Sequence, residues 1–268
     1  MSHFNRKVIK PIIRHRRGER REMKKLRVWM RKEEIDPEAL SGSTAVVIDV
    51  LLATTTLHTI VEGGARRVFP AGSMKEAVEW RESLTSRVLT GGEKDGGLID
   101  GFDCGPFPDE FGSDKVDGKD VVFLTTNGTR AISRARPASR LLIACLRNAP
   151  SVARYLQEES DDIYLICSGS KGYISLEDTW CAAVILSRMD IQGWKLDDAA
   201  WLVREFGRTQ KRKTEDILKQ ARVGRWFVQN ERADLLRYVG DIGASDMLVE
   251  VRDGRLQPLH SRSVHGPD

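Results

Sequence analysis

The chain has 268 residues, of which 40% are hydrophobic and 31% charged, and its formal net charge at pH 7 is +4. These values are typical of a soluble globular protein with a substantial core, in one large domain or two smaller ones. No apolar run approaches the roughly 20 residues that cross a bilayer, and the N-terminus lacks the apolar segment of a secretory signal. We therefore predict a cytoplasmic protein without membrane contact. The four cysteines form no CxxC pair, and the five histidines lack zinc-ligand spacing.

The positive charge is concentrated at the N-terminus. Residues 1–25 contain ten Lys or Arg and two Glu, so the rest of the chain is mildly acidic. We expect residues 1–22 to form a disordered, solvated extension. Two alternatives stay open: this segment binds nucleic acid or another acidic surface, or the natural chain starts at Met23. We also expect a flexible tail at 261–268, which leaves residues 23–260 as a single domain.

Strand-like and helix-like segments alternate along this domain. Strands are expected at 26–30, 45–48, 67–70, 87–89, 121–124, 141–145 and 163–167. Ser73 and Glu76 form a capping box at the start of a helix, and residues 196–239 predict two or three charged helices. The Asp253-Gly254 pair indicates a final hairpin. This order predicts an α/β protein whose sheet is largely parallel, covered by helices on both faces and made mixed by the hairpin.

Residues 94–119 lack helical or strand periodicity and are rich in Gly, Asp and Pro. A loop of this length inside a compact domain is usually functional or disordered. Phe102, Phe107 and Phe111 indicate that it packs on the domain, so we favour a functional loop.

Four of the expected strands end in polar clusters, and the carboxyl ends of parallel strands share one edge of a sheet. Glycine, serine and threonine turns leave backbone N–H groups free for anionic oxygens. Arg130 and Lys171 add positive charge. The predicted substrate-binding residues are Thr54, Thr55, Thr126, Asn127, Gly128, Thr129, Arg130, Ser168, Gly169, Lys171 and Gly172.

Acidic residues in the same clusters predict a Mg²⁺ site. The predicted ligands are Asp49, Glu93, Glu177 and Asp178, because Mg²⁺ prefers hard oxygen ligands, keeps several waters and bridges to phosphate. Asp49 and Glu93 are also the predicted catalytic residues, which hold metal or activate water. Asp49 directly follows four apolar strand residues, where an unpaired acid is costly. We therefore expect a metal or another cation beside it.

These residues also have structural interpretations. Ser175 and Asp178 form a second capping-box pattern, so Asp178 could serve only as a helix cap. Glu177 is favoured by the helix dipole alone, and Lys171 could be solvated. The run Gly169–Gly172 is not a Walker A motif, and a G-x-G-x-x-G fingerprint is absent from the sequence.

Four longer segments resemble, in this order, the blocks of the 2-phosphosulfolactate phosphatases: VVIDVLLATTTL, GGEKDGGLIDGFDCGPFP, LTTNGTRA and CSGSKGYISLEDTWCAA. The resemblance covers residues 23–190 closely and the remainder loosely. It implies an α/β three-layer sandwich and a Mg²⁺-dependent phosphatase acting on a small anionic phosphorylated substrate. The family hydrolyses 2-phosphosulfolactate to sulfolactate and phosphate, a step towards coenzyme M. From the same resemblance we expect that the protein could form a homo-oligomer.

Two departures from the family pattern open an alternative. Leu52 stands where the family usually has arginine, and Gly105–Pro108 stands where it often has G-N-S-P. Loss of an arginine removes a directional contact to an anion. The alternative is a diverged, weakly active or non-catalytic relative that binds an anionic metabolite. Nucleic-acid binding through residues 1–22 ranks third, because the body of the chain is acidic.

Overall fold

The computed structural model describes residues 23–259, so the expectations for 1–22 and 261–268 lie outside the described residues. The strands are β1 (Lys24–Trp29), β2 (Thr44–Ile48), β3 (Arg67–Ala71), β4 (Val88–Gly92), β5 (Asp120–Leu124), β6 (Arg140–Ala144), β7 (Ile163–Cys167), β8 (Trp194–Leu196), β9 (Val249–Arg252) and β10 (Arg255–Pro258). The α-helices are α1 (Ala53–Glu62), α2 (Met74–Ser83), α3 (Ser113–Val116), α4 (Gly128–Ala135), α5 (Ala149–Gln157), α6 (Leu176–Leu186), α7 (Asp198–Thr209), α8 (Thr214–Gln220), α9 (Arg222–Gln229) and α10 (Ala233–Val239). Short 3-10 helices are η1 (Lys32–Glu34) and η2 (Pro108–Glu110).

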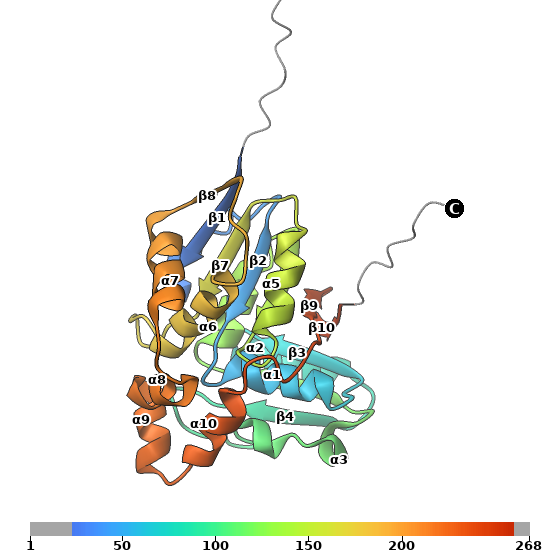
Figure 1. Cartoon of the computed structure of the whole chain (residues 1–268). Coiled ribbons are helices and arrows are strands. Elements are labelled where there is room, and N and C mark those ends of the chain that lie inside the picture. Colours follow the sequence, from blue (N-terminus) through green and yellow to red (C-terminus); the bar gives the residue numbers. More distant parts are fainter. Residues whose placement is uncertain (1–22, 260–268) are drawn as a thin grey trace, which may run out of the picture.

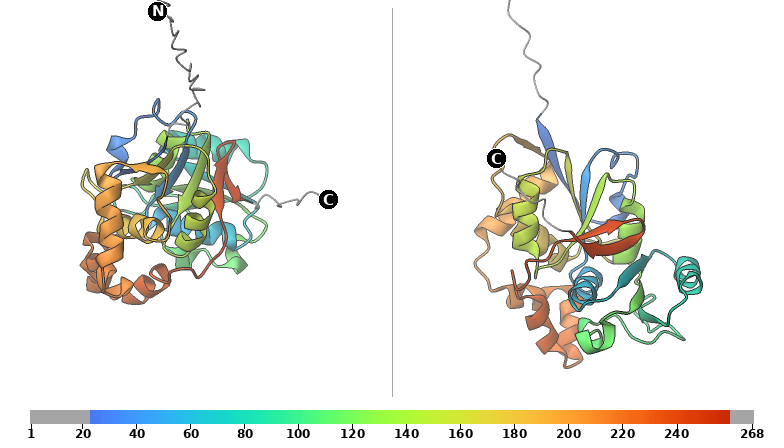
Figure 2. Two further views of the ribbon diagram at one scale, coloured as in Figure 1. Left: turned by 45° about the horizontal axis from the view of Figure 1, so that its top comes forward. Right: turned by 90° about the vertical axis from the view of Figure 1, so that its right-hand side faces the viewer.

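The strands form one mixed sheet in the order β4-β5-β3-β10-β9-β6-β2-β7-β1-β8. We call β4-β5-β3 the small half and β6-β2-β7-β1-β8 the large half; within each half neighbouring strands are parallel. The predicted terminal hairpin, β9–β10, lies between the halves. Strand β10 pairs antiparallel with β3 of the small half, and β9 pairs antiparallel with β6 of the large half. Figure 1 shows the halves running in different directions, and the right-hand view of Figure 2 shows the hairpin between them.

Helices cover both faces of the sheet, as predicted for a three-layer α/β sandwich. On one face of the large half, Val46 and Ile48 of β2 belong to a core shared with α5, α6 and α7. On the opposite face, Ala45 and Val47 join a core that also contains α1, α4 and residues of the small half. All five residues of β2 are buried, as expected for a strand covered on both faces. The predicted fold class is therefore confirmed.

The C-terminal helical part differs in number from the prediction. Residues 198–239 form four helices, because extended residues at 210 and 221 and a turn near 230 interrupt the expected two or three. The sequence also gave no signal for the three-residue strand β8. Ile217, Leu218 and Phe227 are buried in the large-half core, which fixes this part to the rest of the molecule. Within residues 23–259, no helix is both long and apolar enough to span a bilayer.

The loop over residues 94–119 packs on the domain, as its phenylalanines predicted. Phe111 is fully buried, and its ring centroid lies 5.7 Å from that of Phe123 in β5. Phe107 lies edge-on to Phe227 of α9, with ring centroids 5.9 Å apart. The loop thus joins the small half to the C-terminal helices.

Candidate functional site

Asp49 leaves the carboxyl end of β2 and enters a tight turn before α1. Its side chain is buried, with 7% exposed. The Thr54 hydroxyl accepts the Asp49 N–H at 2.9 Å and lies 2.7 Å from the Ala144 carbonyl oxygen, while Thr55 donates to the Val50 carbonyl at 2.8 Å. Both threonines are fully buried. Their hydroxyls therefore support the turn that carries Asp49, and direct contact with a substrate stays a prediction for them.

The loop after β5 brings the small half against Asp49. Gly128 begins α4, and a Cβ at this position would lie 2.6 Å from Asp49 Oδ2 and 2.4 Å from the Cβ of Ala53. The preceding turn is fixed by a reciprocal pair: Thr129 Oγ1 accepts the Thr125 N–H at 2.9 Å, and Thr125 Oγ1 accepts the Thr129 N–H at 3.2 Å. The fully buried Thr129 thus stabilises the turn before α4. Gly128, which has no side chain, lets the first turn of α4 approach Asp49.

Glu93 extends from the end of β4 to the same loop. Its carboxylate accepts the Thr126 N–H at 2.6 Å, the Thr126 hydroxyl at 3.0 Å and the Gly96 N–H at 2.7 Å. The ends of β4 and β5, which were predicted to lie together, are therefore joined by hydrogen bonds. Glu93 is half-buried, and its hydrogen bonds hold the Thr126–Asn127 turn in place.

Ser168 follows β7 and lies beside the end of β2, because its N–H donates to the Ile48 carbonyl at 2.8 Å. Its hydroxyl is fully buried and has no hydrogen-bond partner among the described residues. A buried hydroxyl without a partner is unfavourable. The strand end next to that of Asp49 thus carries a buried hydroxyl without a partner.

Asp178 connects these strand ends instead of capping its helix. Its two carboxylate oxygens accept the Val50 N–H at 2.8 Å and the Gly169 N–H at 3.1 Å. Ser175 makes no side-chain capping bond, so the capping-box interpretation is wrong. Gly169 has a φ of +61°, and a Cβ there would lie 2.6 Å from the Tyr173 carbonyl oxygen. Glycine is required for this tight turn.

The acids act on one another electrostatically. Burial raises the pKa of Asp49 to about 7, and the charges of Glu177 and Glu93 add to the effect, whereas the Ala53 N–H and Lys32 oppose it. Burial likewise raises the pKa of Glu177 and of Asp178. The site therefore holds an excess of buried carboxylates, which is an environment that attracts a cation.

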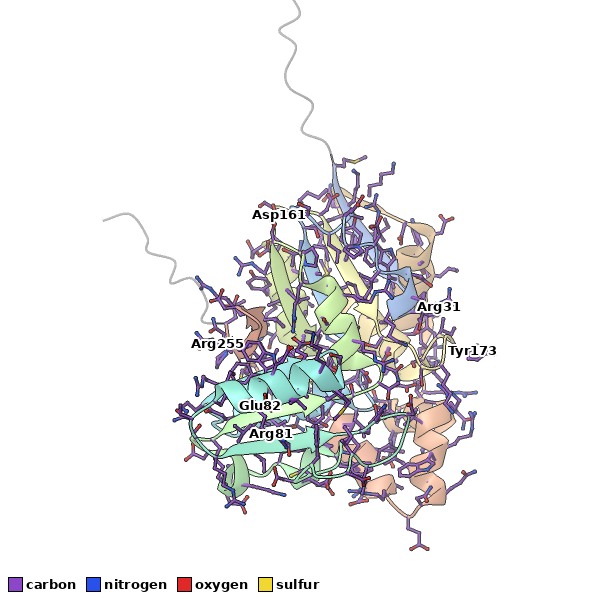
Figure 3. All side chains as sticks on the ribbon, turned by 180° about the vertical axis from the view of Figure 1, so that it is seen from behind. Arg31, Arg81, Glu82, Asp161, Tyr173 and Arg255 are labelled. Carbon is purple, nitrogen blue, oxygen red and sulfur yellow. The ribbon has the colours of Figure 1, made fainter. Side chains whose placement is uncertain are left out.

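Positively charged residues predicted from the sequence lie at the rim. Arg130 and Lys171 are exposed, and Gly172 offers its carbonyl to Arg31 at 2.9 Å. Figure 3 shows Arg31 and Tyr173 on the same side of the molecule. The cation that acts on Asp49 is Lys32, which sequence reasoning missed. The missed signal is its place just after β1, since β1 ends at the same edge of the sheet as β7.

The oxygen donors near Asp49 suit Mg²⁺ only as part of its ligand shell. Among residues 23–259, no three His, Cys, Asp or Glu side chains form a group that could hold a metal ion by itself. Mg²⁺ commonly uses only one or two carboxylates and completes its shell with waters and substrate phosphate. Asp49 and the unpartnered Ser168 hydroxyl are hard oxygen donors of this kind. The hydrogen bonds already made by Glu93 and Asp178 leave fewer lone pairs, and their role as ligands stays a prediction.

The fold and site define an α/β protein whose strand ends gather buried acids, a helix start and open hydrogen-bonding positions, as expected for binding a metal and an anion. A family described as 2-phosphosulpholactate phosphatase matches residues 29–254. A probable 2-phosphosulfolactate phosphatase of Symbiobacterium thermophilum is 38% identical over 222 residues, covering 82% of this chain and 95% of that protein. One from Clostridium perfringens strain SM101 is 33% identical over 241 residues, covering 88% and 97%. The chain therefore belongs to the 2-phosphosulpholactate phosphatase family, a family of phosphoric monoester hydrolases, and the predicted resemblance is confirmed.

Proposed function

We propose that this chain hydrolyses 2-phosphosulfolactate to sulfolactate and phosphate in a Mg²⁺-dependent reaction. The observation that carries the proposal is the meeting of buried Asp49 with the start of α4 and the open hydroxyl of Ser168. The names of the relatives from two genera support the substrate. A small phosphorylated acid needs positive charge and N–H donors around its phosphate, because charge on the phosphoryl oxygens must be stabilised during transfer.

Asp49 and the Ser168 hydroxyl would hold Mg²⁺. When bound, the ion would neutralise phosphate charge and lower the pKa of a coordinated water. The N–H groups of Gly128 and Arg130 in the first turn of α4 would bind phosphate oxygens, aided by the positive end of the helix dipole, whereas the Thr129 N–H is already bonded to Thr125. Glu93 would fix this turn through Thr126. In its ionised form, the Asp49 carboxylate is also placed to accept a proton from an attacking water.

Phosphate release from 2-phosphosulfolactate, measured with and without Mg²⁺, tests the proposal. We expect Mg²⁺-dependent release from the full chain and a loss of at least about 100-fold in Asp49→Asn, because the neutral amide neither holds the metal nor accepts a proton. Asp161→Asn is the matched control: Asp161 is exposed in the turn before β7, at the opposite edge of the sheet (Figure 3). Absence of release from folded wild-type chain, beside an active relative, would contradict the proposal.

One observation favours the alternative of a diverged relative that binds an anionic metabolite. Leu52 is half-buried and packs against the large-half core, so an apolar side chain stands beside the Asp49 turn. The departing segment Gly105–Pro108 is likewise built into the structure, because the Thr56 hydroxyl donates to the Pro106 carbonyl at 2.7 Å. Direct binding of 2-phosphosulfolactate without phosphate release would support this second function.

A further inference from the structure

Lys32 lies where three segments of the candidate site meet. Its ammonium donates to Asn127 Oδ1 at 2.9 Å, in the loop that begins α4. Its backbone N–H donates to the Ser168 carbonyl at 3.1 Å, in the loop after β7. Lys32 itself belongs to η1, which follows β1. One residue therefore joins the large half to the loop from the small half, beside the acid at the end of β2.

The Lys32 ammonium has a donor to spare. Lysine carries three N–H groups, and within residues 23–259 two acceptors face them, Asn127 and Glu33, the latter at 2.8 Å. The side chain is only 12% exposed, so its charge is weakly screened. Ser168, whose carbonyl accepts the Lys32 backbone N–H, has a fully buried hydroxyl without a partner in the described part of the chain. The third N–H of the Lys32 ammonium is thus left for a ligand.

The other basic side chains near these loops are less suited to a fixed anion contact. Arg130 and Lys171 are exposed. Arg222 is exposed and donates to the Ser170 carbonyl at 3.2 Å. Holding a long exposed side chain in one position costs conformational entropy, whereas Lys32 is already held by its two acceptors. Binding of a phosphate to Lys32 therefore costs less side-chain conformational entropy than binding to Arg130, Lys171 or Arg222.

We infer that Lys32 binds the phosphate group of the substrate through its third N–H. The inference rests on the proposed function for the identity of the substrate, and it assigns the phosphate contact to a residue outside the segments that suggested the family. The chemistry recognised is a phosphate dianion. The fixed charge of Lys32 would also offset the carboxylates of Asp49 and Glu93, which otherwise repel such a group.

Titration calorimetry of the full chain with inorganic phosphate, without metal, tests the assignment. We expect Lys32→Met to weaken phosphate binding at least about fivefold, because a charge-assisted hydrogen bond is lost. Lys32→Arg should retain binding, since charge and donors remain. Lys25→Met is the matched control: Lys25 lies near the start of β1, at the opposite end of that strand from Lys32, and is 39% exposed beside Asp162. This control removes the same charge and should bind phosphate as the wild type does.

Wild-type affinity in Lys32→Met, or a wild-type chain that binds no phosphate, would overturn the assignment. If Lys32→Met does not fold, Lys32→Gln replaces it, because its amide can still donate to Asn127 and Glu33. The assignment and the proposed function fail separately. Weakened phosphate binding in the variant, with no phosphate release by the wild type, contradicts the phosphatase only. Phosphate release by the wild type, with unchanged binding in the variant, contradicts the role of Lys32 only.

Discussion

Gly128 and Asp49 are so close that the first residue of α4 can carry no side chain: a Cβ on Gly128 would lie 2.6 Å from Asp49 Oδ2. The two residues come from different halves of the sheet, after β5 and β2 respectively. The contact therefore joins the two halves of the sheet. It places the start of α4 beside the buried Asp49.

Substitution Gly128→Ala should damage both stability and site geometry. The added methyl group would also lie 2.4 Å from the Cβ of Ala53, so α4 must shift away from the turn that carries Asp49. We expect a loss of about 1–3 kcal/mol in the free energy of unfolding. We also expect phosphate release to fall at least about tenfold, because small displacements of positioning groups are costly in catalysis. Urea denaturation and phosphate release measure the two effects.

Gly97→Ala provides the control for this substitution. A Cβ at Gly97 would meet only the Lys94 carbonyl oxygen, at 3.5 Å, which is an ordinary contact. Stability should change by less than about 0.5 kcal/mol. Equal effects of the two substitutions would mean that the Gly128 contact has no special role.

Asp49→Asn should remain folded and become more stable than the wild type at high pH without metal. The folded-state pKa of Asp49 is raised to about 7 from 3.8, so the folded state binds this proton more tightly than the unfolded state does. The contribution of Asp49 to stability therefore decreases as pH rises from 3.8 to about 7. Near pH 8 we expect the neutral variant to gain about 1–3 kcal/mol, measured by urea denaturation.

The effect of Mg²⁺ on the same pair of proteins separates a metal ligand from a merely buried acid. An ion that binds only the folded state raises stability. We expect Mg²⁺ to raise the melting temperature of the wild type near pH 8 and to leave Asp49→Asn unchanged. An equal shift in both proteins would remove Asp49 from the metal site.

Ser168→Ala should uncouple stability from binding. The Ser168 hydroxyl is buried and lacks a partner in the described structure, so its removal should leave stability unchanged or raise it by up to about 1 kcal/mol. Binding of Mg²⁺ and inorganic phosphate should weaken at the same time, measured by titration calorimetry. Loss of stability with intact binding would show that the hydroxyl serves the fold.

Leu52→Arg tests whether the apolar residue belongs to a working site. Since Leu52 packs against the large-half core, a charged side chain there must be partly desolvated, and we expect stability to fall by about 1–2 kcal/mol. Phosphate release from 2-phosphosulfolactate should fall as well. Leu52→Met keeps the apolar contact and should remain close to wild type in both measurements. A large rise in activity would instead support the diverged relative.

Asp120→Asn should weaken the fold in a pH-dependent way. Hydrogen bonds from Arg67, Arg66 and Ser86 hold the pKa of Asp120 well below its usual range, although burial opposes them. Its stabilising contribution is therefore present above about pH 4 and decreases as pH falls further. We expect a loss of about 1–3 kcal/mol near pH 7 and a smaller difference near pH 3. Asp246→Asn, at an exposed pair with Arg154, is the control.

Much of the fold was predictable because its signals are local. Short apolar runs alternate with capping and turn residues, so strands, helices and the hairpin could be placed from the sequence. Asp49 was recognisable because an acid directly after a buried strand demands a partner. Glu93 and Thr126 could be grouped because parallel strands end at one edge, and the structure joins them by hydrogen bonds.

The remaining features depend on contacts between distant segments. Lys32 follows the end of β1, but its role emerges only when η1 meets Asn127 and Ser168. The direction of a hydroxyl is equally invisible in a sequence, so the hydrogen bonds of Thr54 and Thr55 to backbone carbonyls could not be predicted. Asp178 matched a capping pattern, yet backbone N–H groups after two strands compete for it and determine its role.

The hairpin β9–β10 has a consequence for how the protein is made. While the ribosome synthesises the chain, β3 and β6 are both complete long before residues 249–258 emerge, and each leaves one edge unpaired. Open strand edges invite pairing with other molecules, and closing contacts between distant segments is slow. Residues 249–258 thus close the centre of the sheet late, and until they pair, the free edges of β3 and β6 are exposed to misassembly.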